Sequence, residues 1–173
     1  EEDRGVVTGP VREALSRLAG EYPDVIFWVD SRIRIDRFRG LTIKPNQFEA
    51  VGREFPLPGE RVEIDEVTAA ASGLREATGA AVVVTLGERG MLVSDPDPAH
   101  VPGVELSGEL DTTGAGDSAT AGCVLGWASG GTLAEAALVG NLVASITVEQ
   151  LARTGTASRD QLRDRLRLWL EQR

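Results

Sequence analysis

Short, continuous apolar runs alternate with amphipathic helical segments along this chain, and this alternation constrains the fold more than any other feature. The runs are residues 24–30 (DVIFWVD), 40–46 (GLTIKPN) and 80–87 (AAVVVTLG). Such runs are typical of strands that are buried on both faces, as in parallel sheets covered by helices. The sequence therefore predicts a single α/β domain over residues 1–173, with a mostly parallel sheet flanked by helices.

Helix signals separate and follow these runs. Pro10 stands in the first turn of one predicted helix, and Asn46 is a good N-cap for the segment QFEAVG. Residues 63–78 have helical composition and are followed by Gly79, a common residue just beyond a helix end. From Gly114 onward the pattern is helical over residues 115–129, 132–152 and 158–172. Three prolines should keep residues 95–103 from holding regular structure for long.

Composition excludes several classes of function. A net charge of −9 argues against a nucleic-acid backbone or an anionic membrane as the main partner. The single cysteine, Cys123, rules out an intramolecular disulfide and suits a reducing compartment, and we interpret it and Trp127 as helix packing. The lone histidine, His100, argues against a histidine-rich metal site and a Ser–His–Asp triad. Met91 is the only methionine, so we expect a processed product or part of a longer protein.

The stretch DTTGAGDSATAG, residues 111–122, has the glycines of a phosphate-binding loop without the lysine of a P-loop. Gly114 and Gly116 allow backbone amides to point at an anion, which the dipole of the following helix also favours. Asp117 would then lie in the first turn, where it could accept a proton from a substrate hydroxyl. An ordinary helix with a first-turn acid explains the same residues through the helix dipole, so both interpretations stay open.

Two further segments suggest ligand contacts. Asn46 and Glu49 share a helix face and could hold the waters of a magnesium ion. A capping box explains the pair equally and is favoured by pattern alone. Thr85 lies at a predicted strand end, and Gly87 and Gly90 leave room for a nucleotide beside the backbone. The simpler interpretation of these glycines is a hairpin turn that returns residues 90–95 beside the strand.

Together these segments resemble a known family. The order DSR…FRGLTIKPNQFEA, VVVTLGERGMLV and DTTGAGDSATAG is similar to that in the ribokinase-like carbohydrate kinases, also called the PfkB family, and the resemblance covers about residues 4–158. It implies a three-layer α/β/α ribokinase-like (Rossmann-like) fold. It also implies a cytoplasmic enzyme that uses ATP and Mg²⁺ to phosphorylate a hydroxymethyl group of a sugar or sugar-like substrate. No nucleic-acid or membrane partner is expected, and a homodimer stays open.

The resemblance also implies residue roles. Asp117 is similar to the family's catalytic base, with an anion hole made by the amides of Gly114, Ala115 and Gly116. Asn46 and Glu49 resemble the N-x-x-E motif, which acts through Mg²⁺ and phosphate.

Other residues resemble the family's nucleotide and cation sites. Thr85, Gly87 and Gly90 resemble part of the ATP site, and Asn141 a residue near the adenine. Some members have a monovalent-cation site for K⁺, and the positions similar to it are Asp111, Thr113 and the region near Gly155.

The chain also departs from the family pattern. Nothing in it resembles the long N-terminal portion of such kinases, with its Gly-Gly sugar-binding motif and lid strands. The chain therefore resembles their C-terminal half, and fructose, ribose, nucleosides and vitamin alcohols all stay open as substrates. Residues 27–40 are similar to members that act on phosphorylated heptoses.

Two alternatives belong to other classes of protein. The chain could be a non-catalytic remnant or subunit that binds nucleotide, or a hydrolase with Ser118 as nucleophile, although the Gly-x-Ser-x-Gly spacing is absent. We expect Lys44 to be an ordinary exposed lysine, with a phosphate contact as the alternative. The arginine-rich last helix should present a solvated face opposite the stripe of Leu162, Leu166 and Trp169.

Overall fold

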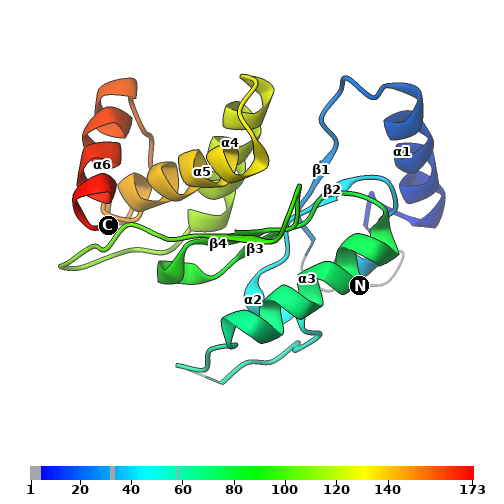
Figure 1. Ribbon diagram of the computed structural model, residues 1–173, viewed down its shortest axis with the longest axis horizontal. Helices are drawn as coiled ribbons and strands as arrows, with labels where there is room; N and C mark the ends of the chain where they lie inside the picture. Colours follow the sequence, from blue (N-terminus) through cyan, green and yellow to red (C-terminus); the bar gives the residue numbers. More distant parts are fainter. Residues whose placement is uncertain (1–4, 32–33, 58) are drawn as a thin grey trace. The chain divides into compact units, whose positions relative to one another are not determined.

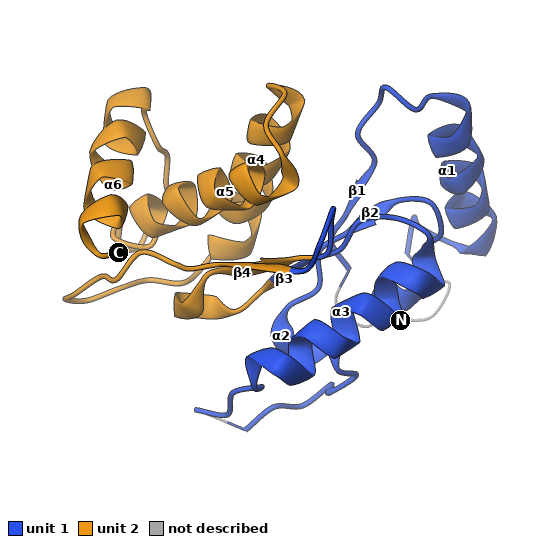
Figure 2. Ribbon diagram, in the orientation of Figure 1, with its two compact units in different colours: residues 1–84, 94–98 blue, residues 85–93, 99–173 orange. Residues whose placement is uncertain are grey.

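The computed structural model describes residues 5–31, 34–57 and 59–173, so Arg32 of the DSR motif lies outside the described residues. The chain forms two compact units (Figure 2). Unit 1 comprises Glu1–Val84 and Ser94–Pro98, and unit 2 comprises Thr85–Val93 and Ala99–Arg173. The helices and strands of each unit are labelled in Figure 1. Across the described ranges, no helix is both long and apolar enough to cross a membrane.

Parallel strand pairing forms the centre of unit 1. Strands β1 (Trp28–Val29) and β2 (Thr42–Ile43) pair in parallel, and a parallel bridge joins Ile43 to Val82, just before β3 (Val83–Thr85). Ile43 and Val82 are fully buried, as predicted for interior strands. By contrast, β1 is only half-buried and is shorter than the run that predicted it, because only its last part has a ladder partner among the described residues.

The helices of unit 1 begin and end close to where the sequence signals place them. They are α1 (Gly9–Glu21), α2 (Gln47–Ala50) and α3 (Ile64–Thr78), with a short 3-10 turn, η1 (Ile35–Arg37). Pro10 stands in the first turn of α1, and Asn46 is the N-cap of α2. Gly79 ends α3 with a left-handed φ of 72°, which glycine adopts without steric cost.

The strands of unit 2 are antiparallel where their pairing is defined. Unit 2 contains the last residue of β3 together with β4 (Met91–Val93) and β5 (Ala99–Val101), in the strand order β3-β4-β5. Strands β4 and β5 pair antiparallel, with Leu92 opposite His100. The turn η2 (Gly87–Arg89) precedes β4, and the Leu86 amide donates to the Gly90 carbonyl at 2.8 Å, as a hairpin requires.

The described sheets are therefore small and partly antiparallel, and the prediction of a mostly parallel sheet is corrected to that extent. The segment 95–103 also contains β5, although its prolines predicted little regular structure. Pairing with β4 supplies the missing stabilisation, because a strand partner satisfies backbone groups that no local signal in this segment could satisfy.

Helices α4 (Ala115–Ala128) and α5 (Leu133–Thr147) pack against each other through glycines. A Cβ added at Gly122 would lie 2.8 Å from the Cα of Gly140. One added at Gly140 would lie 2.4 Å from the sulfur of Cys123, which is fully buried and 3.7 Å from the Met91 sulfur. The interpretation of Cys123 as helix packing is confirmed, and the two glycines explain how closely the helices approach.

Helix α6 (Arg159–Glu171) packs on α5 through one of its arginines. Arg165 has a side chain only 13% exposed; it donates to the Ser145 carbonyl at 3.2 Å and forms an ion pair with Glu149. Arg163 and Arg167 are 70% and 73% exposed, as a solvated face predicts. The prediction of a solvated arginine face is thus corrected at Arg165, whose position on the helix turns it toward α5.

Candidate functional site

The start of α4 is the DTTGAGDS loop. Gly114 is the N-cap, with a left-handed φ of 76°, and a Cβ at this position would meet no atom within 4 Å. Gly114 offers no side chain to cap the helix, and the Ala115 amide donates to the Thr112 carbonyl at 3.1 Å. Across the described ranges, the amides of Gly116 and Asp117 have no side-chain acceptor. Uncapped amides at a helix start are donors for an anion.

Asp117 is the third residue of α4 and is exposed. Within the part of the chain that the structure describes, its carboxylate makes no hydrogen bond or ion pair. The third residues of the other capped helices behave differently: their side chains turn back and accept the N-cap amide, as with Glu49 in α2, Glu135 in α5 and Gln161 in α6. Asp117 is therefore an exposed carboxylate beside uncapped amides, an arrangement that can hold an anion and accept a proton.

Asp111 links the same loop to the segment that follows α5. One carboxylate oxygen accepts the Thr113 amide at 3.0 Å, and the other accepts the Ala152 amide at 3.1 Å. The Asp111 amide in turn donates to the Val148 carbonyl at 2.8 Å. The Thr113 side chain and the two amides lower the pKa of the Asp111 carboxyl, because their hydrogen bonds favour the charged form. Asp111 thus fixes the start of the loop that carries Asp117.

A monovalent cation at Asp111 would need other oxygen ligands. Among the described residues, no group of three or more His, Cys, Asp or Glu could hold a metal. Backbone carbonyls and hydroxyl groups such as that of Thr113 would have to supply the other ligands. The nearby turn is held by hydrogen bonds. Gln150 donates to the Thr156 carbonyl at 2.7 Å and accepts its amide at 3.2 Å. A Cβ at Gly155 would lie 2.5 Å from the Cβ of Thr147.

Asn46 and Glu49 form the capping box of α2. The Asn46 Oδ1 accepts the amides of Phe48 and Glu49 at 2.8 and 3.0 Å, and one Glu49 oxygen accepts the Asn46 amide at 2.8 Å. The capping-box interpretation is confirmed. Because two amides occupy the Asn46 oxygen, it does not fit a direct metal ligand. A carboxylate has two oxygens with further acceptor capacity, so Glu49 fits a contact with a metal-bound water.

The two glycines expected at the nucleotide site differ. Gly87, with a φ of 65°, is exposed, and a Cβ there would meet no atom within 4 Å. Gly90 is buried, and a Cβ there would lie 2.2 Å from the Val101 carbonyl oxygen and 2.4 Å from the Gly103 amide nitrogen. The space beside Gly90 is therefore filled by the chain itself, whereas that beside Gly87 is open. Thr85, the last residue of β3, is half-buried.

Asn141 lies on α5 and is 7% exposed. Its amide nitrogen donates to the carbonyls of Val101 and Pro102, at 3.0 and 3.3 Å. These bonds fasten the end of β5 to α5, so the nitrogen already has acceptors and only the side-chain oxygen is left for an adenine.

Lys44 differs from its prediction. It is 4% exposed, and its Nζ lies 2.9 Å from the Asp30 carboxylate, so the prediction of an exposed lysine is wrong. The two residues directly follow β1 and β2, in which Val29 lies opposite Ile43. The parallel register therefore makes Asp30 and Lys44 neighbours. Aligning the two predicted strands as a parallel pair would have predicted this ion pair from the sequence.

The predicted site residues fall into both units. Unit 1 contains Asn46 and Glu49, while unit 2 contains the remaining ones: Thr85, Gly87, Gly90, Asp111, Thr113, Gly114, Ala115, Gly116, Asp117 and Asn141.

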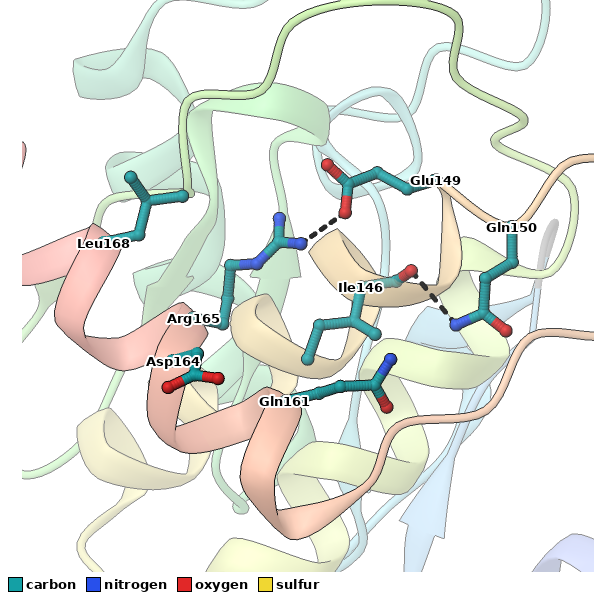
Figure 3. Close-up of a pocket in the computed structure, with 7 residues that line it drawn as sticks. All are labelled: Ile146, Glu149, Gln150, Gln161, Asp164, Arg165 and Leu168. Carbon is teal, nitrogen blue, oxygen red and sulfur yellow. Dashed lines mark hydrogen bonds and ion pairs between the residues drawn. The ribbon is translucent and has the colours of Figure 1, made fainter.

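A pocket of about 360 Å³ in unit 2 lies between the end of α5 and α6. Figure 3 shows Arg165 directed toward Glu149, and Gln150 bonded to the carbonyl of Ile146 at 3.2 Å. None of the residues that line it belongs to the predicted site. Since it contains neither a glycine loop nor an uncapped helix start, the chemistry favours the start of α4 as the candidate site.

Comparison with known proteins places these features in a family. Residues 41–158 match the model of the pfkB family carbohydrate kinases. The chain is 31% identical over 166 residues to the bifunctional protein HldE of a Nitratiruptor species, covering 94% of this chain and 34% of that protein. It is 44% identical over 70 residues to inositol 3-kinase of Arabidopsis thaliana, covering 40% of this chain and 20% of that protein.

Among solved structures, the chain resembles phosphofructokinase-2 from Escherichia coli in complex with potassium. The TM-score is 0.69 at 25% identity, over 91% of this chain and 53% of that one. The fold is therefore ribokinase-like. The chain spans less than two thirds of the length of each of these relatives. Because the family model covers more than half of the chain, including the DTTGAGDS loop, the chain belongs to the pfkB family of carbohydrate kinases.

Proposed function

We propose that this chain carries the nucleotide-binding and catalytic part of a kinase that transfers a phosphoryl group from ATP to a hydroxymethyl group of a sugar or sugar-like alcohol. The start of α4 is the observation that carries the proposal. Among the residues that the structure describes, the Asp117 carboxylate has no bonding partner and no side chain caps the neighbouring amides. Residues 41–158, which match the family model, include this loop.

In the proposed mechanism, the hydroxyl oxygen of the substrate attacks the terminal phosphorus of ATP. Asp117 accepts the proton of that hydroxyl. The bond between the terminal phosphorus and the oxygen that bridges it to ADP breaks, and ADP leaves. The amides of Gly114, Ala115 and Gly116 stabilise the negative charge of the phosphoryl group in transit, that of Ala115 in place of its bond to the Thr112 carbonyl. No lysine of the P-loop type is required there, because amides supply the donors without adding a charge that would hold the product.

Magnesium, when bound, neutralises charge on the phosphates. Glu49 would hold it through water, while Asn46 keeps α2 in place by capping it. The nucleotide would lie beside Thr85, the open backbone at Gly87, and Asn141, with Gly90 shaping the turn.

A monovalent cation such as K⁺ would lie at Asp111 and Thr113, whose hydrogen bonds keep the Asp111 carboxylate charged. Potassium appears in the complex of the phosphofructokinase-2 relative, which supports this part of the proposal. The relatives' names, a phosphofructokinase and an inositol kinase, support a sugar or polyol as the acceptor.

Replacing Asp117 by Asn tests the proposal. The amide keeps the size of the side chain but cannot accept a proton, so we expect kcat to fall by about 10²–10⁴-fold while ATP affinity stays unchanged. The measurement is ADP release over a panel of sugars and polyols, with ATP binding followed by calorimetry. Asp65→Asn is the matched control, because Asp65 is an exposed first-turn acid of α3 and should retain full activity.

Two outcomes would contradict the proposal. If Asp117→Asn kept more than about a tenth of the wild-type kcat, a loss under ~1.4 kcal/mol in barrier height, Asp117 would be an ordinary helix-start acid. If the wild-type protein bound ATP but phosphorylated no alcohol in the panel, the chain would be a nucleotide-binding remnant.

A further inference from the structure

The end of α6, Trp169 together with the C-cap residue Gln172, holds the segment that directly follows β5, residues 102–105. The Nε1 of Trp169 donates to the Pro102 carbonyl at 2.8 Å. The Gln172 side chain bonds both backbone groups of Glu105: its oxygen accepts the amide and its nitrogen donates to the carbonyl, each at 3.0 Å. A neighbouring strand would satisfy backbone groups in the same way. The end of α6 therefore serves as a strand partner for a segment that lies beyond the ladder of β4 and β5.

The same segment supports the turn η2. The Arg89 carbonyl accepts the Gly103 amide at 3.2 Å and lies 2.8 Å from the Nε2 of His100. A Cβ at Gly103 would lie 2.3 Å from the Glu88 carbonyl oxygen, so the turn and the segment are in direct contact. Gly87, whose open backbone belongs to the proposed nucleotide site, is the first residue of this turn. Displacing the segment would therefore displace the turn.

The segment also holds Asn141, the predicted adenine contact on α5. The amide nitrogen of Asn141 donates to the Pro102 carbonyl at 3.3 Å and to the Val101 carbonyl at 3.0 Å. The Pro102 carbonyl oxygen thus accepts bonds from both Asn141 and Trp169. A carbonyl oxygen has two acceptor lone pairs, and these two donors use both. Pro102 therefore joins the end of α6 to Asn141.

No deeply buried side chain anchors α6. Every residue of α6 is described, and none of them is fully buried. Burial of an apolar face supplies most of the stability of a typical helix in a protein, so α6 depends more than usual on hydrogen bonds such as those of Trp169 and Gln172. An element with few buried apolar contacts opens at a low free energy. A ligand that steadies residues 102–105 can therefore shift the docking of α6.

We propose that the end of α6 is a positioning element of the nucleotide site in unit 2, with Trp169 as its main positioning residue. By holding residues 102–105, it keeps η2 and Asn141 in place for the nucleoside part of ATP. The proposal rests on the proposed function, from which it takes the nucleotide site, and adds a helix outside the motifs of that site. Because coupling between two equilibria is reciprocal, nucleotide binding should also strengthen the docking of α6. A purely structural bond would change stability but not nucleotide affinity.

Tryptophan signals test this coupling in the wild-type protein. The sequence has three tryptophans, so the ¹⁵N-labelled full chain gives three indole signals, of which sequential assignment identifies that of Trp169. We expect the Trp169 signal to shift on saturation with ADP. It should stay in place with inorganic tripolyphosphate, which has no nucleoside to contact Asn141 or η2. An unchanged Trp169 signal at saturating ADP would overturn the proposal.

Two variants measure the effect by calorimetry. Trp169→Phe keeps an aromatic ring but removes the Nε1 donor, and it should weaken ADP binding by about 3- to 10-fold, as expected for one hydrogen bond. Gln172→Leu removes both bonds to Glu105 and should weaken ADP binding by a similar factor. Neither variant should change the binding of tripolyphosphate, for which the start of α4 supplies the donors. The matched control is Arg167→Ala, because Arg167 is 73% exposed on the same helix and pairs with Asp164 of that helix; it should change neither affinity.

The outcomes separate this proposal from the proposed function. If Trp169→Phe weakened ADP binding by less than about threefold, or weakened ADP and tripolyphosphate binding alike, the positioning role would be overturned even if the kinase reaction were established. A wild-type chain that bound no ADP would overturn it as well. Conversely, a protein that shows the Trp169 signal shift but transfers no phosphoryl group would contradict the proposed function alone. If either variant failed to fold, the indole signal of the wild-type protein would still decide the question.

Discussion

In unit 2, α4 and α5 both have a carboxylate as their third residue, and the two carboxylates differ in what they contact. Glu135 of α5 turns back to accept the Thr132 amide at 2.7 Å and its hydroxyl at 2.9 Å, while that hydroxyl accepts the Glu135 amide at 3.2 Å. In α4, Gly114 replaces the threonine, and Asp117 makes no such bond within the described ranges. One helix start is closed by its own side chains, and the other is open.

The difference has an energetic meaning. Glycine at the N-cap in place of a capping side chain costs only about a few tenths of a kcal/mol, so the stability that α4 forgoes relative to α5 is small. The glycine N-cap and the shorter acid leave amide donors and a carboxylate to solvent, where an anionic substrate can use them. Functional sites often give up local stability that a bound ligand can restore. The comparison therefore supports the start of α4, rather than that of α5, as the phosphate-binding site.

Gly140→Val should have the largest effect on stability, because it breaks the packing on which both helices depend. A Cβ at this position would already lie 2.4 Å from the Cys123 sulfur and 2.9 Å from the Ala119 carbonyl oxygen. We expect a loss of at least about 3 kcal/mol, at the upper end for overpacking. In a chain of this size that lowers Tm by about 6–12 °C in thermal unfolding.

The matched control for Gly140→Val is Gly73→Ala in α3, where a Cβ meets no atom within 4 Å. This change should raise stability by up to about 1 kcal/mol, because alanine is the better helix former. A Gly140→Val protein that melted within about 2 °C of wild type would show that α4 and α5 do not pack through this glycine.

Glu135→Ala and Asp117→Ala compare the two helix starts at the same helical position. Glu135→Ala removes the two hydrogen bonds that the Glu135 carboxylate accepts from Thr132 and should cost about 1–2 kcal/mol in urea unfolding. Asp117→Ala removes only an attraction to the helix dipole and should cost about 0.3–1 kcal/mol. Equal costs would mean that Asp117 caps α4, and the contrast between the two helices would be lost.

Signals that act over a few residues were sufficient to predict most helix boundaries. Pro10 and Asn46 mark helix starts, and Gly79 marks an end, because caps and turns depend on the conformation of adjacent residues. The glycines and the acid of DTTGAGDS likewise indicated a helix start with a candidate site. The sequence could not show that Asp117 stays unbonded, since Glu135 stands at the same helical position and forms a capping box.

The residue environments that the sequence did not predict depend on contacts with residues distant along the chain. Lys44 is buried because Asp30 follows the neighbouring strand, and Gly90 is crowded because β5 returns beside it. Arg165 is largely buried because α6 packs on α5. In each case the residue type is compatible with an exposed position, and only the tertiary contact determines its environment.

Asp111 should give a smaller, pH-dependent effect that reports on the loop before α4. Its folded pKa is lowered, so its contribution to stability is present above its unfolded pKa and is lost as pH falls through its folded pKa. The difference in unfolding free energy between wild type and Asp111→Asn should therefore be constant near neutrality and shrink below about pH 4. A difference that stayed constant down to about pH 2 would contradict the assigned hydrogen bonds.

The most direct test of the open helix start is an amide NMR titration of the ¹⁵N-labelled protein with magnesium and ADP. The open start predicts that the amide signals of Gly114, Ala115 and Gly116 shift on binding, because these donors would bond the phosphates. Those of Leu133, Ala134 and Glu135, at the closed start of α5, should stay near their free positions. Signals of the α4 start that moved no more than those of α5, at saturating nucleotide, would contradict the claim that α4 binds phosphate.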